Sequence, residues 1–194
     1  YEGVAVYARS FAVPSKWKGQ AIRLQFDAVN FRADVWLNGY AIGQHEGGYG
    51  PFEFQIDDLI DWQGTNFLSV RVLGPIIEEN KTIDGLSRND APHWRGAITG
   101  GIWQSVRLIA SGSVMIDDLF VIPVLDQDMA RVELSLENSG LLICEEQVIV
   151  EVEDEETGEV VAREERTIRL KPGVDVSELV PGVHECSSIS TLEW

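Results

Sequence analysis

Side chains that can do chemistry are concentrated between residues 74 and 101. This segment has two prolines and five glycines, and its polar and aromatic residues include Asp84, Arg88, Asn89, Asp90, His93, Trp94 and Arg95. A connection of this length without a convincing strand is uncommon in a compact domain, and such segments are usually functional or disordered. Trp94 argues against full disorder, because burying a tryptophan removes about 150–250 Å² from water. We therefore expect this loop to be pinned against the fold.

A second group of polar and aromatic side chains, residues 44–49, follows a predicted β-hairpin whose turn is Asn38-Gly39. Asn-Gly is the dipeptide that best predicts a two-residue type I′ turn. Residues 44–49, Gln-His-Glu-Gly-Gly-Tyr, offer amide, imidazole, carboxylate and phenol groups to a sugar. The simpler interpretation, which we favour, is a turn whose glycines serve the backbone, with Tyr49 and Phe52 closing the core.

Other candidates for chemistry are weaker. Glutamates occur as adjacent pairs at 145–146, 155–156 and 164–165, and adjacent side chains on a strand point to opposite faces, so no pair acts on one substrate. The three histidines are scattered and no Cys or His pair has zinc-ligand spacing, so no metal site and no cofactor are predicted. Cys144 and Cys186 permit at most one disulfide. Cys144 shares a period-2 face with Val148 and Val150, which favours a small buried thiol.

Short runs of alternating apolar and polar residues predict an all-β protein. We expect strands at 4–13, 21–28, 33–37, 40–44, 52–56, 67–73 and 102–109, then at 114–124, 130–137, 147–153 and 160–170, followed by a polar tail. Residues 154–159 are interpreted as a solvated hairpin tip, and the less favoured alternative is a calcium site. Ile22, Leu24 and Phe26 point to one face and Arg23 to the other. This pattern indicates antiparallel sheets packed face to face, each with one polar face.

The charge changes near residue 112 of this 194-residue chain. Residues 1–112 contain 12 acidic and 10 basic side chains, whereas residues 113–194 contain 20 and 5. Five of the six tryptophans precede the change. Two of them, Trp36 and Trp103, lie inside predicted strands, where packing in the core or between domains is favoured over ligand stacking. We therefore predict two domains, residues 1–112 and 113–194.

Composition also excludes two classes of partner. The acidic second half would be repelled by nucleic acid phosphates and by anionic lipid, so neither nucleic acid nor a membrane surface is an expected partner. No apolar run approaches the roughly 20 residues that span a bilayer, and no signal peptide opens the chain, which predicts a soluble protein. The chain does not start with methionine, so we expect it to begin inside a longer protein. Any targeting signal would precede it, and the compartment stays open.

Six groups of residues, in this order, resemble the N-terminal part of glycoside hydrolase family two, the family of β-galactosidases, β-glucuronidases and β-mannosidases. They are Tyr7-Ala8-Arg9-Ser10-Phe11 with Val13-Pro14 and Trp17-Lys18-Gly19; Leu24-Gln25-Phe26-Asp27-Ala28-Val29; Val35-Trp36-Leu37-Asn38-Gly39; Gly43 with Gly47-Gly48-Tyr49 and Pro51-Phe52; Asn66 with Leu68 and Val70-Arg71-Val72; and Gly100-Gly101-Ile102-Trp103-Gln104-Ser105-Val106-Arg107-Leu108. No single group is diagnostic, but the ordered set is specific. The acidic second half resembles that family's second domain.

The resemblance implies a galactose-binding-like jelly-roll β-sandwich at residues 1–112, then an immunoglobulin-like β-sandwich at residues 113–194, cut short. It also implies a partner, the (β/α)₈ catalytic barrel, which needs about 250 residues and is absent from this chain. Family members place two glutamates about 5–5.5 Å apart on that barrel for a retaining mechanism, so no catalytic residue is expected here. Leu192-Glu193-Trp194 resembles the start of an element near the end of the second domain, so both termini look like fragment boundaries.

In some family members a loop of the first domain reaches the sugar pocket of the barrel. The corresponding loop here is residues 84–95, and Asp90, His93, Trp94 and Arg95 would contact carbohydrate, with Asp90 accepting hydroxyl hydrogen bonds and Trp94 stacking on a sugar ring. The simpler alternative is that the loop only packs against neighbouring domains. The spacing between Trp94 and Gly101 departs from the family pattern.

Three functions follow from the sequence. The first is the non-catalytic N-terminal portion of a retaining exo-β-glycosidase, which scaffolds the barrel and can lend it a loop. The second is an autonomous carbohydrate-binding module, suggested by the polar and aromatic loops. The third is a structural or adhesive β-sandwich protein. The sequence does not specify which sugar or linkage is cleaved or the oligomeric state.

Overall fold

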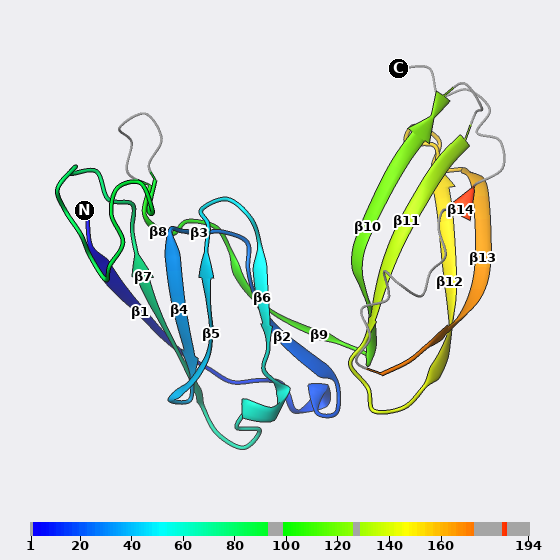
Figure 1. Ribbon diagram of the computed structural model, residues 1–194. Helices are drawn as coiled ribbons and strands as arrows, with labels where there is room; N and C mark the ends of the chain where they lie inside the picture. Colours follow the sequence, from blue (N-terminus) through cyan, green and yellow to red (C-terminus); the bar gives the residue numbers. More distant parts are fainter. Residues whose placement is uncertain (1, 93–98, 126–128, 173–183, 186–194) are drawn as a thin grey trace. The chain divides into compact units, whose positions relative to one another are not determined.

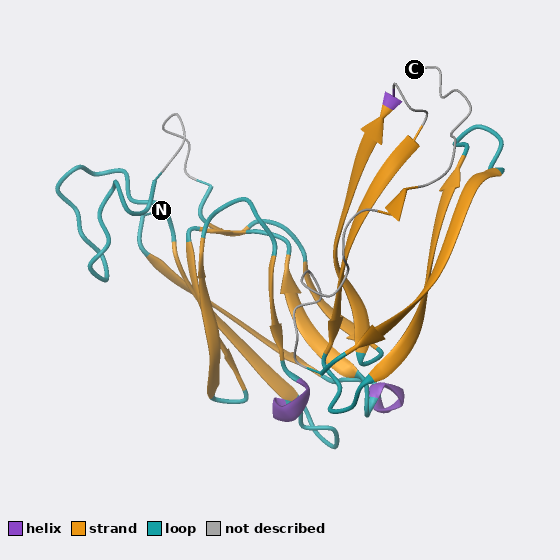
Figure 2. Ribbon diagram, turned by 45° about the vertical axis from the view of Figure 1, so that its right-hand side comes forward, coloured by secondary structure: helices purple, strands orange, loops and turns teal. Residues whose placement is uncertain are grey.

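The computed structural model describes residues 2–92, 99–125, 129–172 and 184–185 (Figure 1). The chain divides into two compact units, Tyr1–Ser111 and Gly112–Trp194, and each is described by itself. Strands dominate both units, which confirms the all-β fold class (Figure 2). Among the described residues, no helix is long and apolar enough to cross a membrane.

The first unit consists of two antiparallel sheets and a short extra pair of strands. The first sheet has the strand order β1-β7-β4-β5 and the second has the order β6-β2-β9, while β3 pairs with β8. In chain order the elements are β1 (Val4–Phe11), η1 (Ser15–Trp17), β2 (Ala21–Phe26), β3 (Val29–Asn30), β4 (Arg32–Leu37), β5 (Tyr40–Glu46), β6 (Phe52–Gln55), η2 (Asp57–Leu59), β7 (Asn66–Leu73), β8 (Gly101–Ile102) and β9 (Val106–Ser111).

The core of this unit lies between the two sheets, where the predicted alternation places it. Leu68, Val70 and Val72 of β7 are buried, and they face Leu24 and Phe26 of β2 across the sandwich. Full burial of each such side chain contributes about 1.5–3 kcal/mol relative to an exposed one. Strand β4 shows the same two-residue period, which fixes its register against β7 and β5.

The prediction that Arg23 lies on a solvent-facing surface of β2 is wrong, because Arg23 is only 2 % exposed. Strand β2 is the central strand of its sheet, so neighbours on both sides cover its outer face. The guanidinium pairs with Glu53 of β6 at 3.1 Å and donates to the hydroxyl of Ser111 of β9 at 3.2 Å. Those two neighbouring strands supply the partners that burial of a charge requires.

The expected strand at 102–109 is two strands. Gly101–Ile102 pairs with β3, a two-residue strand that the sequence pattern does not show, and Val106–Ser111 pairs with β2. Trp103 lies in the break between them, and its backbone N–H donates to the carbonyl of Ala28 at 3.4 Å. The side chain of Trp103 is 44 % exposed, so it does not pack in the core of this unit, and the alternative of packing between domains stays a prediction.

Trp36 also lies outside the core. It sits on β4 between the buried Val35 and Leu37, so its side chain is on the opposite face of the sheet, where it is half-buried. Its register partners on that face are Ala41 and Ser69.

The second unit contains β10 (Val114–Val124), β11 (Met129–Asn138) and β14 (His184–Glu185) in one sheet, and β12 (Cys144–Glu153) and β13 (Val160–Leu170) in another. Leu134, Leu136 and Leu170 form its core, and the half-buried Cys144 and Val148 pack against them. The period-2 face predicted for Cys144 is therefore present, although the thiol is less buried than expected. Strand β14 falls in the stretch expected to be a polar tail, and Cys186 lies outside the described residues.

Candidate binding end of the first sandwich

The loop between β7 and β8, residues 74–100, includes most of the predicted site residues, and its first half is tied to the sheet. Arg71 of β7 forms ion pairs with Asp34 of β4, at 3.0 Å, and with Asp84 of the loop. The hydrogen bond with Asp84, followed by that with Asp34, raises the pKa of the Arg71 guanidinium above its usual range. The sheet thus holds the loop through a permanently charged side chain.

Within this loop, Asp84 and Gly85 form a two-residue turn. Both have positive φ, 53° and 80°, and Ile83 and Leu86 exchange two backbone hydrogen bonds of 3.0 Å. This is the type I′ pattern, which Asp-Gly favours because both residues tolerate positive φ. The dipeptide is the sequence signal for the turn, but one paired residue on each side is too short to be recognised as a strand.

Asp90, the predicted sugar contact that the structure describes, forms a local turn. Its carboxylate accepts hydrogen bonds from the backbone N–H of Ser87 at 2.9 Å and from the Ser87 hydroxyl at 2.6 Å. These bonds lower the pKa of Asp90 below its ordinary value, because they favour the charged form. The side chain is exposed and ionised at neutral pH. Asp90 is therefore a fixed surface charge that also stabilises the loop.

Two further contacts anchor the loop to the unit. The carboxylate of Glu2 accepts hydrogen bonds from the backbone N–H of Ile77 and from that of Glu78, at 3.0 Å, and pairs with Lys81 at 2.8 Å. The bond from Lys81 is the main reason that the pKa of Glu2 is lowered. Ile76 is fully buried, and its backbone N–H donates to the carbonyl of Ala91 at 3.2 Å. These contacts pin the described residues of the loop, while Trp94, on which the expectation rests, lies outside the described residues.

Asn30 connects this loop to the loop that follows β5. Its side-chain amide donates to the carbonyl of Thr99 at 2.8 Å, and the side chain is 4 % exposed. Gly48 lies so close that a Cβ on it would be 2.6 Å from Oδ1 of Asn30. The sequence gives no signal for this role, since Asn30 and Thr99 are 69 residues apart.

An exposed aromatic pair joins the loop that follows β5 to the connection between β8 and β9. The ring centroids of Tyr49 and Trp103 are 5.8 Å apart with an interplanar angle of 67°, and the Trp103 indole N–H donates to the carbonyl of Gly48 at 2.8 Å. Tyr49 is 69 % exposed, so the prediction that it closes the core is wrong. The indole hydrogen bond holds the pair in place, and rigid exposed aromatic rings of this kind suit stacking on a sugar or on another protein surface.

His45 and Gln44, two polar residues of the 44–49 segment, contact other residues of the sandwich. The His45 ring stacks on Phe52, with centroids 4.1 Å apart, and Phe52 stacks on the buried Phe26 at 4.8 Å. Partial burial lowers the pKa of His45, which keeps the imidazole neutral. Gln44 accepts a hydrogen bond from Arg32 at 3.2 Å. This supports the favoured interpretation for these two residues, with Phe52 closing the core as expected.

Three of the predicted contacts, His93, Trp94 and Arg95, lie outside the described residues. Among the described residues, no group of three or more His, Cys, Asp or Glu side chains is placed to hold a metal ion. What the structure brings together at this end is a pinned loop with a fixed carboxylate, a buried asparagine and an exposed aromatic pair. These groups can bind a polar ring or a protein surface.

The first unit is a β-sandwich, and comparison with known proteins assigns it to a family of domains. The model of the glycosyl hydrolases family 2 sugar-binding domain matches residues 1–111. The chain therefore belongs to glycoside hydrolase family 2, as the sequence motifs predict.

Individual relatives agree with the family match. A β-glucuronidase of Bacteroides fragilis is 29 % identical over 191 residues, covering 92 % of this chain and 26 % of that protein. A β-galactosidase of Thermoanaerobacterium thermosulfurigenes is 32 % identical over 126 residues, covering 62 % of this chain and 15 % of that protein. The crystal structure of a Bacteroides uniformis β-glucuronidase shares the fold, with a TM-score of 0.75 at 23 % identity over 96 % of this chain and 22 % of that one. The chain spans about a quarter or less of the length of these relatives.

Proposed function

We propose that this chain is the non-catalytic N-terminal portion of a retaining exo-β-glycosidase, an enzyme that hydrolyses O-glycosyl bonds in carbohydrate metabolism. The observation that carries the proposal is the match of residues 1–111 to the family's sugar-binding domain in a chain that spans 26 % of its glucuronidase relative. The two domains, residues 1–112 and 113–194, scaffold a (β/α)₈ catalytic domain. Carbohydrate is bound together with that domain and only weakly without it.

The contribution of this chain to the sugar pocket is the loop of residues 74–100. A loop that lends side chains to another domain contributes more binding free energy if it is already ordered, since ordering it on contact costs about 1–2 kcal/mol per residue. The pairs Arg71–Asp84 and Lys81–Glu2 and the bond from Asn30 to Thr99 hold both halves of this loop. Asp90 is then a preformed hydrogen-bond acceptor for sugar hydroxyl groups, with His93, Trp94 and Arg95 next to it in the sequence.

Turnover assays on two proteins test the proposal: the 194-residue chain, and a longer polypeptide in which it precedes its catalytic domain. Chromogenic β-galactosides, β-glucuronides and β-mannosides are the substrates. The longer protein is expected to hydrolyse at least one of them, with retention of anomeric configuration, while the isolated chain hydrolyses none. Activity of the isolated chain that persists through stringent purification would refute the non-catalytic assignment.

Tyr49 and Trp103 favour a second candidate, an autonomous carbohydrate-binding module. Sugar rings stack on exposed aromatic side chains. The hydrogen bond from the Trp103 indole N–H to the carbonyl of Gly48 holds the Tyr49–Trp103 pair in place before a ligand binds. Titration calorimetry of the isolated chain against mono- and oligosaccharides decides between the two. Saturable binding that Trp103→Ala abolishes supports the module. The control is Tyr40→Ala, because Tyr40 is another exposed aromatic residue, at 65 %, and lies beside the hairpin turn at the other end of β5.

A further inference from the structure

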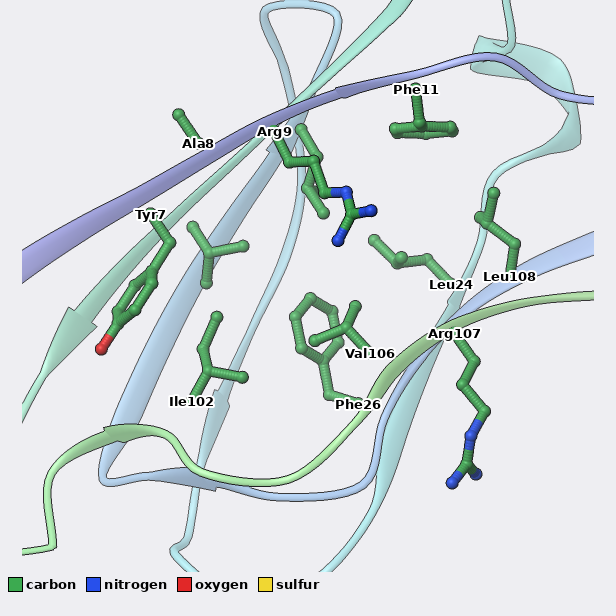
Figure 3. A pocket seen from close by; sticks show the side chains of 12 residues that line it. Tyr7, Ala8, Arg9, Phe11, Leu24, Phe26, Ile102, Val106, Arg107 and Leu108 are labelled. Atoms are coloured by element: carbon green, nitrogen blue, oxygen red, sulfur yellow. The ribbon is translucent and has the colours of Figure 1, made fainter.

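The two sheets of the first unit are open along one side. Strands β1 and β9 are the end strands of their sheets on that side, and no described strand pairs with the outer edge of either. Between them lies a cleft of about 520 Å³ that is lined by core residues, among them Leu24 and Phe26 (Figure 3). An open edge above an apolar cleft is a template for pairing with another strand.

The two edges differ in how they are protected. The residues of β1 on the core-facing side include Tyr7 and Arg9, and Figure 3 shows the Arg9 side chain extending into the cleft. A charged side chain that points inward is a known device against unwanted strand pairing. The core-facing residues of β9 are Val106, Leu108 and Ala110, and Arg107 points away from the cleft, where it pairs with Asp27 at 2.7 Å. The unprotected edge is that of β9.

The spacing between the two sheets favours a β-strand over a helix as the occupant of the cleft. Packed sheets lie about 10 Å apart, which leaves room for one layer of side chains, whereas a helix with its side chains is about 10–12 Å wide. A strand that extends the sheet beyond β9 places every second side chain in the cleft and keeps its backbone paired. Val106, 38 % exposed at the edge, is the residue that such a strand would cover.

We propose that the edge of β9 and the cleft beside it bind an extended polypeptide strand, supplied by the same longer protein, with apolar side chains at alternate positions and one carboxylate among them. The carboxylate follows from Arg9. No carboxylate among the described residues pairs with Arg9, and a strand that covers the cleft would bury its guanidinium, which is costly without an ionic partner. That this strand comes from the same polypeptide rests on the proposed function, because it requires a polypeptide longer than this chain.

Peptide binding to the 194-residue chain tests the surface. The probe is a fluorescent nine-residue peptide that alternates valine and threonine and carries a glutamate at its central inward position, followed by anisotropy. Saturable binding is expected, weakened at least about tenfold by Arg9→Glu, which corresponds to about 1.4 kcal/mol. A second peptide with lysine in place of the glutamate should bind Arg9→Glu better than the unchanged chain. Failure of this charge reversal, or absence of saturable binding, overturns the proposal.

Two controls keep the outcomes distinct. Val106→Asp should abolish peptide binding, whereas Val6→Asp should not, because Val6 is 66 % exposed on the outer face of β1. Self-association of the chain that Val106→Asp removes would assign the edge to a second copy and would overturn the proposal. In the longer protein, hydrogen exchange at residues 106–111 should be slower than in the isolated chain, and equal rates contradict supply in cis. None of these measurements depends on turnover, so their failure is separate from failure of the proposed function.

Discussion

The side-chain amide of Asn38 donates a hydrogen bond of 2.8 Å to Oδ1 of Asn66, which ties the turn of the β4–β5 hairpin to the first residue of β7. Asn38 has φ 53° and Gly39 has φ 87°, so the predicted type I′ turn is confirmed. Oδ1 of Asn66 also accepts from the backbone N–H of Asp61 at 2.8 Å, and Asn66 is fully buried. One buried amide therefore sets the positions of a hairpin tip, a surface loop and a strand.

Replacing Asn66 with alanine should lower the free energy of unfolding of the first unit by about 2–3 kcal/mol, because it removes several hydrogen bonds and leaves buried partners unsatisfied. Urea denaturation followed by tryptophan fluorescence measures the change, since the described tryptophans all lie in this unit. Asn80→Ala is the control: Asn80 is exposed, and its replacement should change stability by less than about 0.5 kcal/mol. Equal effects of the two variants would contradict a role for the Asn38–Asn66 pair.

Gly48→Ala should disrupt the binding end of the first sandwich. A Cβ at this position would meet Oδ1 of Asn30 at 2.6 Å, so Asn30 must move and its bond to Thr99 is strained or lost. We expect a destabilisation of about 1–3 kcal/mol, as for other overpacked sites, and faster hydrogen exchange near residue 99. Gly50→Ala is a matched control in the same loop, because nothing lies within 4 Å of a Cβ there.

The stack of His45 on Phe52 should make the first unit less stable in mild acid. Burial lowers the pKa of His45 in the folded protein, so its contribution is fully present above the unfolded pKa of about 6.5 and is lost as pH falls through the lower folded value. His45→Phe keeps the stack and removes the proton site. Between about pH 7 and pH 5 its unfolding free energy should fall less steeply than that of the unchanged chain. Parallel curves would show that His45 is not responsible.

The carboxylates with lowered pKa values act in a different range. Glu2, Asp90 and Asp154 stabilise the folded state above their unfolded pKa values of about 4, and this contribution is lost at lower pH. They do not obscure the His45 effect at pH 5–7.

The sequence is sufficient to predict the strands whose alternation or turn chemistry is local. Strands β10 and β13 begin and end where expected, and the Asn38-Gly39 turn needs only two residues to specify it. The predictions fail where the burial of a side chain depends on strands that are distant in the sequence. Arg23 is buried because β6 and β9 flank it, and neither neighbour is visible from the alternation of β2.

The binding end of the first sandwich is predictable only in part, because its contacts also join residues that are distant in the sequence. The loop of residues 74–100 stands out through its composition, but the residues that pin it lie far away in the sequence: Glu2 is 79 positions from Lys81 and Asn30 is 69 from Thr99. The sequence also does not show that Tyr49, expected to close the core, is exposed. Its ring lies against Trp103, whose indole N–H donates to the carbonyl of Gly48, and both partners are distant in sequence from each other.

The Arg71–Asp84 pair should control the order of the loop that we propose to reach the sugar pocket. Asp84→Asn removes the charge but keeps a residue that tolerates positive φ, so the turn with Gly85 persists while its tie to the sheet weakens. Hydrogen exchange at the amides of Ile83 and Leu86 should become several-fold faster. In the longer protein the same variant should raise KM more than it lowers kcat, because it disorders a binding loop and leaves the catalytic carboxylates unchanged.

Arg88→Leu is the matched control, since Arg88 pairs with Glu79 within the loop at 3.2 Å and does not tie it to the sheet. This variant should leave the exchange of Ile83 and Leu86 unchanged. If Asp84→Asn speeds exchange without altering KM, the loop is ordered by Arg71 but does not contribute to the sugar pocket, and the packing interpretation of residues 84–95 is correct. If neither quantity changes, the ion pair with Arg71 does not order the loop.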